Sequence, residues 1–127
     1  MYYNENIEKT AIENENFRTV LYTDPRLQLV VMSLKPGEEI GMEVHNELDQ
    51  FVRIEAGEGK AILDDQEFTL GDGSVVIVPK GTNHNIVNTS TTTELKLYTI
   101  YTPPEHAEGV VHATKAEADA DDEHYHG

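Results

Sequence analysis

Cysteine is absent from the 127-residue sequence, and basic residues are scarce. Without cysteine the chain forms no disulfide and offers no thiolate metal ligand or cysteine nucleophile. Nine Lys and Arg residues stand against 24 Asp and Glu residues, which gives a formal net charge of −15. This charge repels a nucleic-acid backbone or an anionic membrane surface at long range. We therefore expect a protein that binds neither nucleic acid nor a membrane.

Long apolar runs are also missing from the sequence. No stretch approaches the roughly 18 consecutive apolar residues that a membrane-spanning helix needs. Residues 1–6 carry neither the basic region nor the apolar core of a signal peptide. Together with the lack of cysteine, these features favour a cytoplasmic location.

The charge is distributed unevenly along the chain, which suggests one folded domain with two extensions. Residues 105–127 hold seven acidic residues against Lys115 alone, and almost nothing apolar follows Val111. Such a composition cannot bury enough apolar surface to offset the entropy of ordering, so we expect a flexible, disordered acidic tail that contains histidines. Residues 1–16 would form an N-terminal arm and residues 17–104 a single barrel domain.

Residues 17–102 show short β-branched runs that are separated by Gly, Pro, Asn and Asp. This pattern is typical of an all-β sandwich or barrel, whereas Asn6–Asn16 favours no more than a frayed helical turn. The expected strands are Phe17–Tyr22, Leu27–Leu34, Met42–His45, Gln50–Ala56, Lys60–Leu63, Glu67–Leu70, Ser74–Val78, His84–Asn88 and Leu95–Thr102.

Four side chains in this region have the chemistry of a metal site: Glu43, His45, Gln50 and His84. Glu43 and His45 are two residues apart, so on a strand they point to the same face. Gln50 returns on the neighbouring strand, and His84 arrives from the second half of the barrel. Two nitrogens and two oxygens suit a divalent transition metal such as Zn, Mn, Fe, Ni or Co.

The spacing around the first three of these residues resembles a known family motif. Gly37-(x)5-Glu43-x-His45-(x)4-Gln50-(x)6-Gly57 is similar to the first cupin motif, G(x)5HxH(x)3–4E(x)6G. The resemblance departs from the motif at Glu43, where cupins have their first metal-binding His, and at Gln50, where they have Glu.

A second string resembles the second cupin motif, G(x)5PxG(x)2H(x)3N. Gly73-(x)5-Pro79-x-Gly81-(x)2-His84-(x)3-Asn88 agrees with it at every named position. The two strings follow one another in the order found in cupins. The resemblance implies a double-stranded β-helix, or jelly-roll barrel, that binds one metal ion through Glu43, His45, Gln50 and His84.

The altered ligand set resembles that of type I phosphomannose isomerases in composition, and the chain looks like the small bacterial cupins called mannose-6-phosphate isomerase-like. This implies a metal-dependent protein that acts on a carbohydrate-derived or small oxygenated substrate, with sugar isomerisation as one reaction class. A small cupin of unsaturated-uronate breakdown also carries Gln at the position of Gln50. A ring-opening enzyme, a dioxygenase and a non-catalytic ligand-binding cupin therefore remain alternatives.

Several residues are left open by the sequence. Tyr98 and Tyr101 are three positions apart, so only one of them can line the pocket. The tail histidines His106 and His112 could fold back over the barrel mouth, and His124 and His126 could remain on the surface. Small cupins often pair through their sheets, so the resemblance implies a homodimer, for which Leu27–Leu34 would provide an apolar edge strand.

Overall fold

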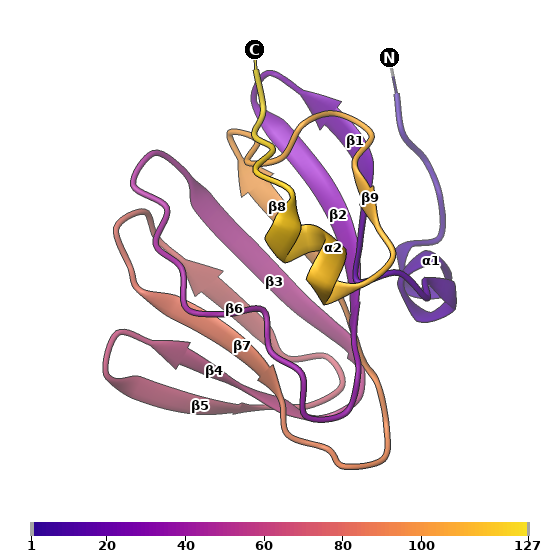
Figure 1. Cartoon of the computed structure of the whole chain (residues 1–127), viewed down its shortest axis with the longest axis vertical. Coiled ribbons are helices and arrows are strands. Elements are labelled where there is room, and N and C mark those ends of the chain that lie inside the picture. The colour runs from indigo at the N-terminus through magenta and orange to yellow at the C-terminus, as the bar shows by residue number, and fades with distance from the viewer. Residues whose placement is uncertain (1, 127) are drawn as a thin grey trace.

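The structure is a computed structural model, and it describes residues 2–126 (Figure 1). Within these residues, nine strands and two helices follow one another. Neither helix is long and apolar enough to span a membrane. The elements are α1 (Ile7–Glu13), β1 (Arg18–Asp24), β2 (Leu27–Leu34), β3 (Asp49–Ala56), β4 (Gly59–Leu63), β5 (Gln66–Leu70), β6 (Val75–Val78), β7 (His84–Asn88), β8 (Leu95–Thr102), β9 (Val111–His112) and α2 (Lys115–Ala120).

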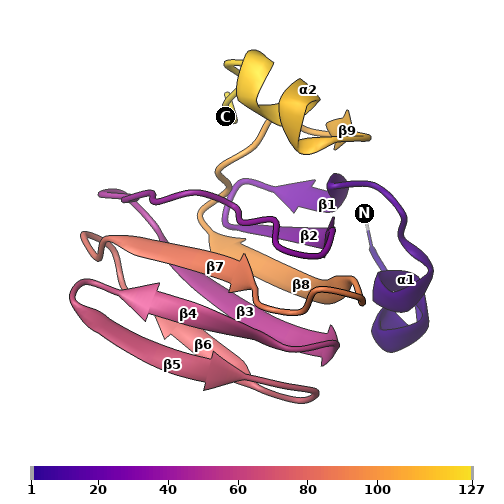
Figure 2. The same ribbon diagram turned by 60° about the horizontal axis from the view of Figure 1, so that its bottom comes forward.

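The strands form two antiparallel sheets that face one another, which confirms the predicted all-β barrel (Figure 2). The larger sheet has the order β6-β3-β8-β2-β1-β9, and the smaller has the order β5-β4-β7. Their facing sides supply a continuous apolar core that includes the fully buried residues Met32, Leu34, Ile54, Leu95 and Leu97. Burial of these side chains provides the main driving force for closing the barrel.

Residues 42–45 do not form the strand that we expected. Gly41 has a φ of +110°, a backbone conformation that interrupts a regular strand. The backbone is nevertheless held against β7, because Gly41 N–H donates to the Asn85 side chain and Glu43 pairs with His84 in an isolated bridge. The segment is therefore extended and fixed without being part of a ladder.

Strand β2 lies inside the larger sheet, between β8 and β1. The suggestion that Leu27–Leu34 forms an exposed edge strand is therefore corrected. Continuous apolar sequence indicates a strand buried on both faces as readily as an edge. The edges of this sheet are β6 and β9.

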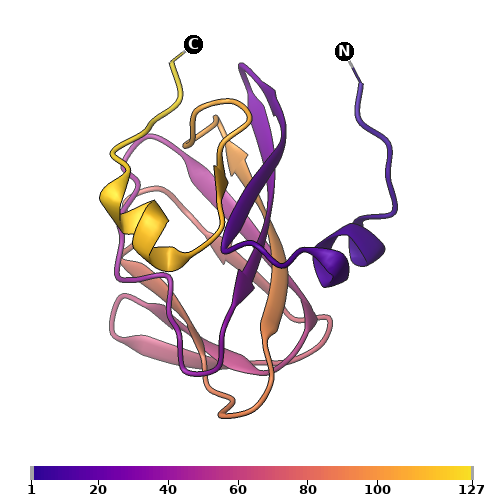
Figure 3. The ribbon, with the colours of Figure 1, turned by 45° about the vertical axis from the view of Figure 1, so that its right-hand side comes forward.

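The acidic tail also differs from expectation, because residues 105–126 are folded onto the barrel (Figure 3). Strand β9 pairs with β1, and a capping box between Thr114 and Glu117 begins α2. His106 and His112 are buried. Composition gave the wrong picture because this segment is ordered mainly by specific polar contacts with the barrel, while only Val110 and Ala118 pack against the apolar core. Residue 127 lies outside the described residues.

Gln28 on β2 is the main anchor of this C-terminal segment. Its side chain is fully buried, and its Nε2 donates to Thr23 Oγ1 at 3.0 Å and to the His106 carbonyl at 2.8 Å. Its Oε1 accepts from the backbone N–H groups of Glu105, at 3.2 Å, and of His106, at 2.9 Å. One amide side chain thus satisfies the backbone where the chain leaves the barrel.

We predict that Gln28→Ala lowers the free energy of unfolding by about 1–3 kcal/mol, because buried backbone groups lose their partners. Urea denaturation measures this loss, and hydrogen exchange should show reduced protection confined mainly to residues 105–126. Gln66→Ala, at an exposed glutamine on β5, is the matched control and should change neither. Unaltered protection of residues 105–112 in the Gln28 variant would contradict the anchoring role.

Candidate metal centre

Glu43, His45 and His84 converge inside the barrel, as the motif spacing predicted. Each offers one ligand atom, and these atoms lie within 4.8 Å of one another. Met42 and Val44, which alternate with them, are exposed. Backbone hydrogen bonds in both directions between Glu43 and His84, at 2.9 and 2.8 Å, fix the two chain segments together. The alternation therefore turns both motif side chains inward.

His84 is arranged as a ligand. It is 4% exposed, and its Nδ1 lies 3.0 Å from the Thr82 carbonyl oxygen, which can only accept. Nδ1 therefore carries the proton, and Nε2 has a free lone pair. That Nε2 is buried and has no hydrogen-bond partner among the described residues. A carbonyl that fixes the tautomer of a histidine is a common feature of metal sites.

His45 stands next to His84, with the two ring centroids 5.2 Å apart. Burial, and then the positive charges that His84, His124 and Arg18 can carry, lower the pKa of His45 to about 4. The imidazole is therefore neutral at pH 7, which is the form that binds a metal. Its Nδ1 lies 3.7 Å from a carboxylate oxygen of Glu105.

Glu43 is the acidic member of the group. Burial raises the pKa of its carboxyl group, while the positive charges that His84 and Arg18 can carry oppose that shift. Across residues 2–126 no cationic side chain forms an ion pair with Glu43. A largely buried carboxylate without a partner is destabilising, and a bound cation removes that penalty.

Gln50 on β3 is buried, and it pairs across the sheet with Tyr101, whose ring packs against His45. Its Nε2 donates to Thr99 Oγ1 at 3.0 Å, and its Oε1 is buried without a partner in the part of the chain described. The Thr99 contact thus orients Oε1 as an acceptor. Two imidazole nitrogens, one carboxylate and this orphaned amide oxygen fit the donor preferences of a divalent transition metal.

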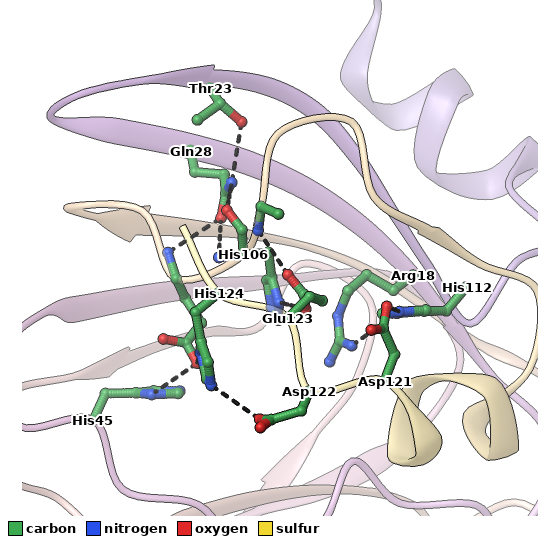
Figure 4. A network of polar contacts seen from close by, with 12 residues as sticks. Arg18, Thr23, Gln28, His45, His106, His112, Asp121, Asp122, Glu123 and His124 are labelled. Atoms are coloured by element: carbon green, nitrogen blue, oxygen red, sulfur yellow. Dashed lines mark hydrogen bonds and ion pairs between the residues drawn. The ribbon is translucent and has the colours of Figure 1, made fainter. Parts of the chain in front are cut away.

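A cavity of ≈ 140 Å³ lies between the barrel and the C-terminal segment, and Glu43 forms part of its wall. We call this cavity the chamber. Figure 4 shows several of the side chains that surround it. The lining residues are Phe17, Arg18, Ile40, Glu43, Glu105, His106, Ala118, Asp119, Asp121, Asp122, Glu123 and His124.

Sequence reasoning missed Arg18, Glu105 and Glu123, which lie outside both motifs. Arg18 had a usable signal, because it shares strand parity with the apolar Val20, and both side chains are buried. No sequence signal marked Glu105 and Glu123, because the acidic residues of the tail cannot be told apart until the segment packs against the barrel.

Of the two tyrosines that the sequence left undecided, Tyr101 is the one that faces inward. It is 3% exposed, and its ring packs edge-on against both His45 and His106. Tyr98 lies on the other face of β8, with its ring centroid 6.1 Å from that of Phe51. Burial raises the pKa of the Tyr101 hydroxyl, so it stays protonated at neutral pH. Tyr101 therefore places one neutral phenol beside His45 and His106.

The tail histidines separate into two kinds. His106 and His112 are buried beneath the C-terminal segment, and each contacts a carboxylate, Glu123 and Asp121 respectively. His124 is largely exposed, with Nε2 3.4 Å from an Asp122 carboxylate oxygen. The first pair thus folds back onto the barrel.

Comparison with known proteins agrees with the fold of the barrel. The model of the cupin domain family matches residues 30–101. The chain is 45% identical over 119 residues to YrkC of Bacillus subtilis (strain 168), an alignment that covers 89% of this chain and 63% of YrkC. The chain belongs to the cupin family. It spans less than two thirds of the length of that relative.

Two solved structures illustrate the range of this likeness. BH2720 of Bacillus halodurans has a TM-score of 0.92 and 41% identity, with 94% of each chain covered. KdgF from a Halomonas species has a TM-score of 0.63 and 20% identity, with 68% of this chain and 76% of KdgF covered. The second likeness shows the shared fold alone.

The raised pKa of Glu43 leads to a prediction about stability. Because the folded-state pKa lies above the unfolded one, stability is lost as pH rises through the folded value and is regained below the unfolded value of about 4.3. In protein treated with a chelator, Glu43→Gln should therefore be more stable than the parent at pH 7 and equal to it below about pH 4.

With saturating Mn²⁺ or Zn²⁺ at pH 7, the parent should instead be more stable than Glu43→Gln, because the ion stabilises the parent and leaves the variant nearly unchanged. Urea denaturation with and without chelator measures the difference in free energy of unfolding between parent and variant, and so checks both predictions. Glu58→Gln, at an exposed glutamate, should follow the parent throughout. A chelated Glu43→Gln protein that is less stable than the parent at pH 7 would contradict the unpaired burial of this carboxylate.

Proposed function

We propose that this cupin holds one divalent transition metal through Glu43, His45, His84 and Gln50, and acts on a carbohydrate-derived or small oxygenated substrate. The observation that carries the proposal is the convergence of three ligand atoms within 4.8 Å. The unpartnered Nε2 of His84 and Oε1 of Gln50 support it, since buried polar atoms in folded proteins usually have partners.

Neighbouring residues orient three of the four proposed ligands. Thr82 and Thr99 orient His84 and Gln50, respectively, and Glu105 lies beside His45. When bound, the divalent ion supplies Lewis acidity toward a carbonyl or hydroxyl oxygen. The chamber is bordered by several protonatable groups, which suits a reaction that moves a proton. We therefore favour sugar isomerase-like chemistry among the reaction classes open to a metal-binding cupin.

The metal assignment predicts about one ion per chain in the parent protein and almost none in a Glu43→Ala, His84→Ala variant. Plasma mass spectrometry on tag-free protein, both as purified and after reloading, measures this difference. The matched control is Glu58→Ala, His126→Ala, which removes the same residue types at exposed positions and should keep its metal.

Full metal occupancy in the Glu43, His84 variant would overturn the assignment, as would a metal-free parent after reloading. The identity of the bound ion then directs the assays. Zinc or manganese leads to isomerisation assays on aldoses and ketoses, whereas iron leads to oxygen-uptake measurements.

We also propose that the chain forms a homodimer through the outer surface around β6. This strand is an edge of the larger sheet and exposes Val75 and Ile77. They border a shallow, mainly apolar hollow of ≈ 360 Å³, which Phe68 of β5 also lines. An unprotected edge with an apolar surface is suited to pairing with a second copy.

If this surface pairs, Ile77→Glu should convert a dimer into a monomer, because the new charge would be buried in the interface. Light scattering coupled to gel filtration gives the mass. Ile12→Glu changes an exposed isoleucine of α1 in the same way and should leave the dimer intact. A monomeric parent at micromolar concentration would refute the pairing.

A further inference from the structure

The part of the chain that closes the chamber from outside is attached with very little apolar contact. We call residues 113–126 the cover; they comprise α2 and the residues on either side of it. No residue of α2 is buried, and within the cover only Ala118 packs against the apolar core. A segment that buries so little apolar surface opens easily. The position of the cover therefore depends on polar and charged contacts.

Carboxylates crowd the wall of the chamber. Two come from outside the cover, Glu43 and Glu105, and Arg18 is the only Lys or Arg among the described residues that line the wall. The cover contributes four more carboxylates: Asp119, Asp121, Asp122 and Glu123. Because like charges repel, packing the cover against the barrel carries an electrostatic penalty. A positive charge close to Glu43 and Glu105 would reduce that penalty.

Glu105 stands between the metal centre and the cover. Its Oε2 lies 3.7 Å from Nδ1 of His45 and 3.8 Å from Nδ1 of His124, and its backbone carbonyl accepts the N–H of Tyr125 at 3.0 Å. Nε2 of His124 lies in turn 3.4 Å from a carboxylate oxygen of Asp122 (Figure 4). One carboxylate is thus the neighbour of a proposed metal ligand on one side and of the cover on the other.

The negative charge of Glu105 has no fixed positive partner. Within residues 2–126, no Lys or Arg side chain forms an ion pair with it. Burial raises the pKa of its carboxyl group, the charge that His124 can carry lowers it, and the charges of Glu43 and Glu123 raise it. An ion at the metal centre adds positive charge on the His45 side of this carboxylate, where partial burial strengthens the attraction.

We propose that Glu105 is a positioning residue that couples the metal centre to the cover, so that a divalent ion bound in the barrel holds the cover in place. The inference rests on the proposed function, since the ion is the one assigned to Glu43, His45, His84 and Gln50. By thermodynamic linkage, the packed cover increases the affinity for the ion by the same factor. The chamber is therefore fully closed mainly in metal-loaded protein.

Hydrogen exchange measured by mass spectrometry tests the coupling on the full chain at pH 7 and constant ionic strength. The samples are chelated protein and protein reloaded with Mn²⁺, with the metal content of each measured. We expect Mn²⁺ to slow exchange in residues 113–126 about tenfold, a typical size for coupling between sites. Exchange in α1, which lies outside the chamber, should not change. Mg²⁺, which prefers oxygen ligands, should have little effect at the same concentration.

Glu105→Gln separates coupling from a purely structural role, because it removes the charge and keeps the shape. In chelated protein, the cover of this variant should exchange no faster than that of the parent, since a repulsive charge is gone. Mn²⁺ should no longer slow the exchange, and calorimetry should show Mn²⁺ binding weakened by the same factor of about ten. Glu105→Asp should recover part of both effects. Glu108→Gln, at an exposed glutamate nearby in the sequence, should behave like the parent.

The outcomes distinguish this inference from the metal assignment. One Mn²⁺ per chain without slower exchange in the cover would refute the coupling alone, whereas a parent that binds no ion after reloading would refute the metal centre and the coupling together. Equal Mn²⁺ effects in Glu105→Gln and the parent, or an equal effect of Mg²⁺, would also overturn the coupling. So would slowing by Mn²⁺ in the Glu43→Ala, His84→Ala variant, because the carboxylates of the cover would then hold the ion.

Discussion

Burial of ionisable groups inside the barrel is the constraint on which the site depends. Desolvation is the first cause of the pKa shifts of Glu43, Glu105 and His45, and it pushes each group toward its neutral form. An apolar filling of the same space would avoid this penalty, as buried ion pairs replaced by apolar residues show in other proteins. The barrel therefore keeps a polar region beside its apolar core, and the unpartnered atoms of that region are suited to a cation.

The C-terminal segment completes this interior instead of extending away from it. From composition alone, its acidic residues and histidines resemble those of a solvated tail. In the structure they contact one another in pairs, Glu123 with His106 and Asp121 with His112. The segment is joined to the barrel through Gln28 and through the pairing of β9 with β1. The candidate metal ligands thus lie under a cover that is held by polar contacts and that leaves a cavity beside Glu43.

Strand positions and the inward side chains of the motifs were predictable because they depend on local rules. The bounds of β2, β7 and β8 coincide with the expected ones, since β-branched runs between turn residues define them. Glu43 and His45 point inward together because of their two-residue spacing. The other residues that line the chamber were not predictable in the same way, because Arg18 and Glu123 come from opposite ends of the chain and reach the same cavity only after folding.

The sequence by itself determined the cupin barrel and the three residues that converge as candidate ligands, because motif spacing and strand alternation are properties of neighbouring residues. Only the tertiary structure decided that β2 lies inside a sheet, that Tyr101 and not Tyr98 faces inward, and that the tail forms a wall of the chamber. Those outcomes depend on contacts between residues far apart in the sequence, such as Arg18 and His112, which are 94 positions apart. Amino-acid composition contains no information about such pairs, whereas the folded chain brings each of these residues next to a particular partner.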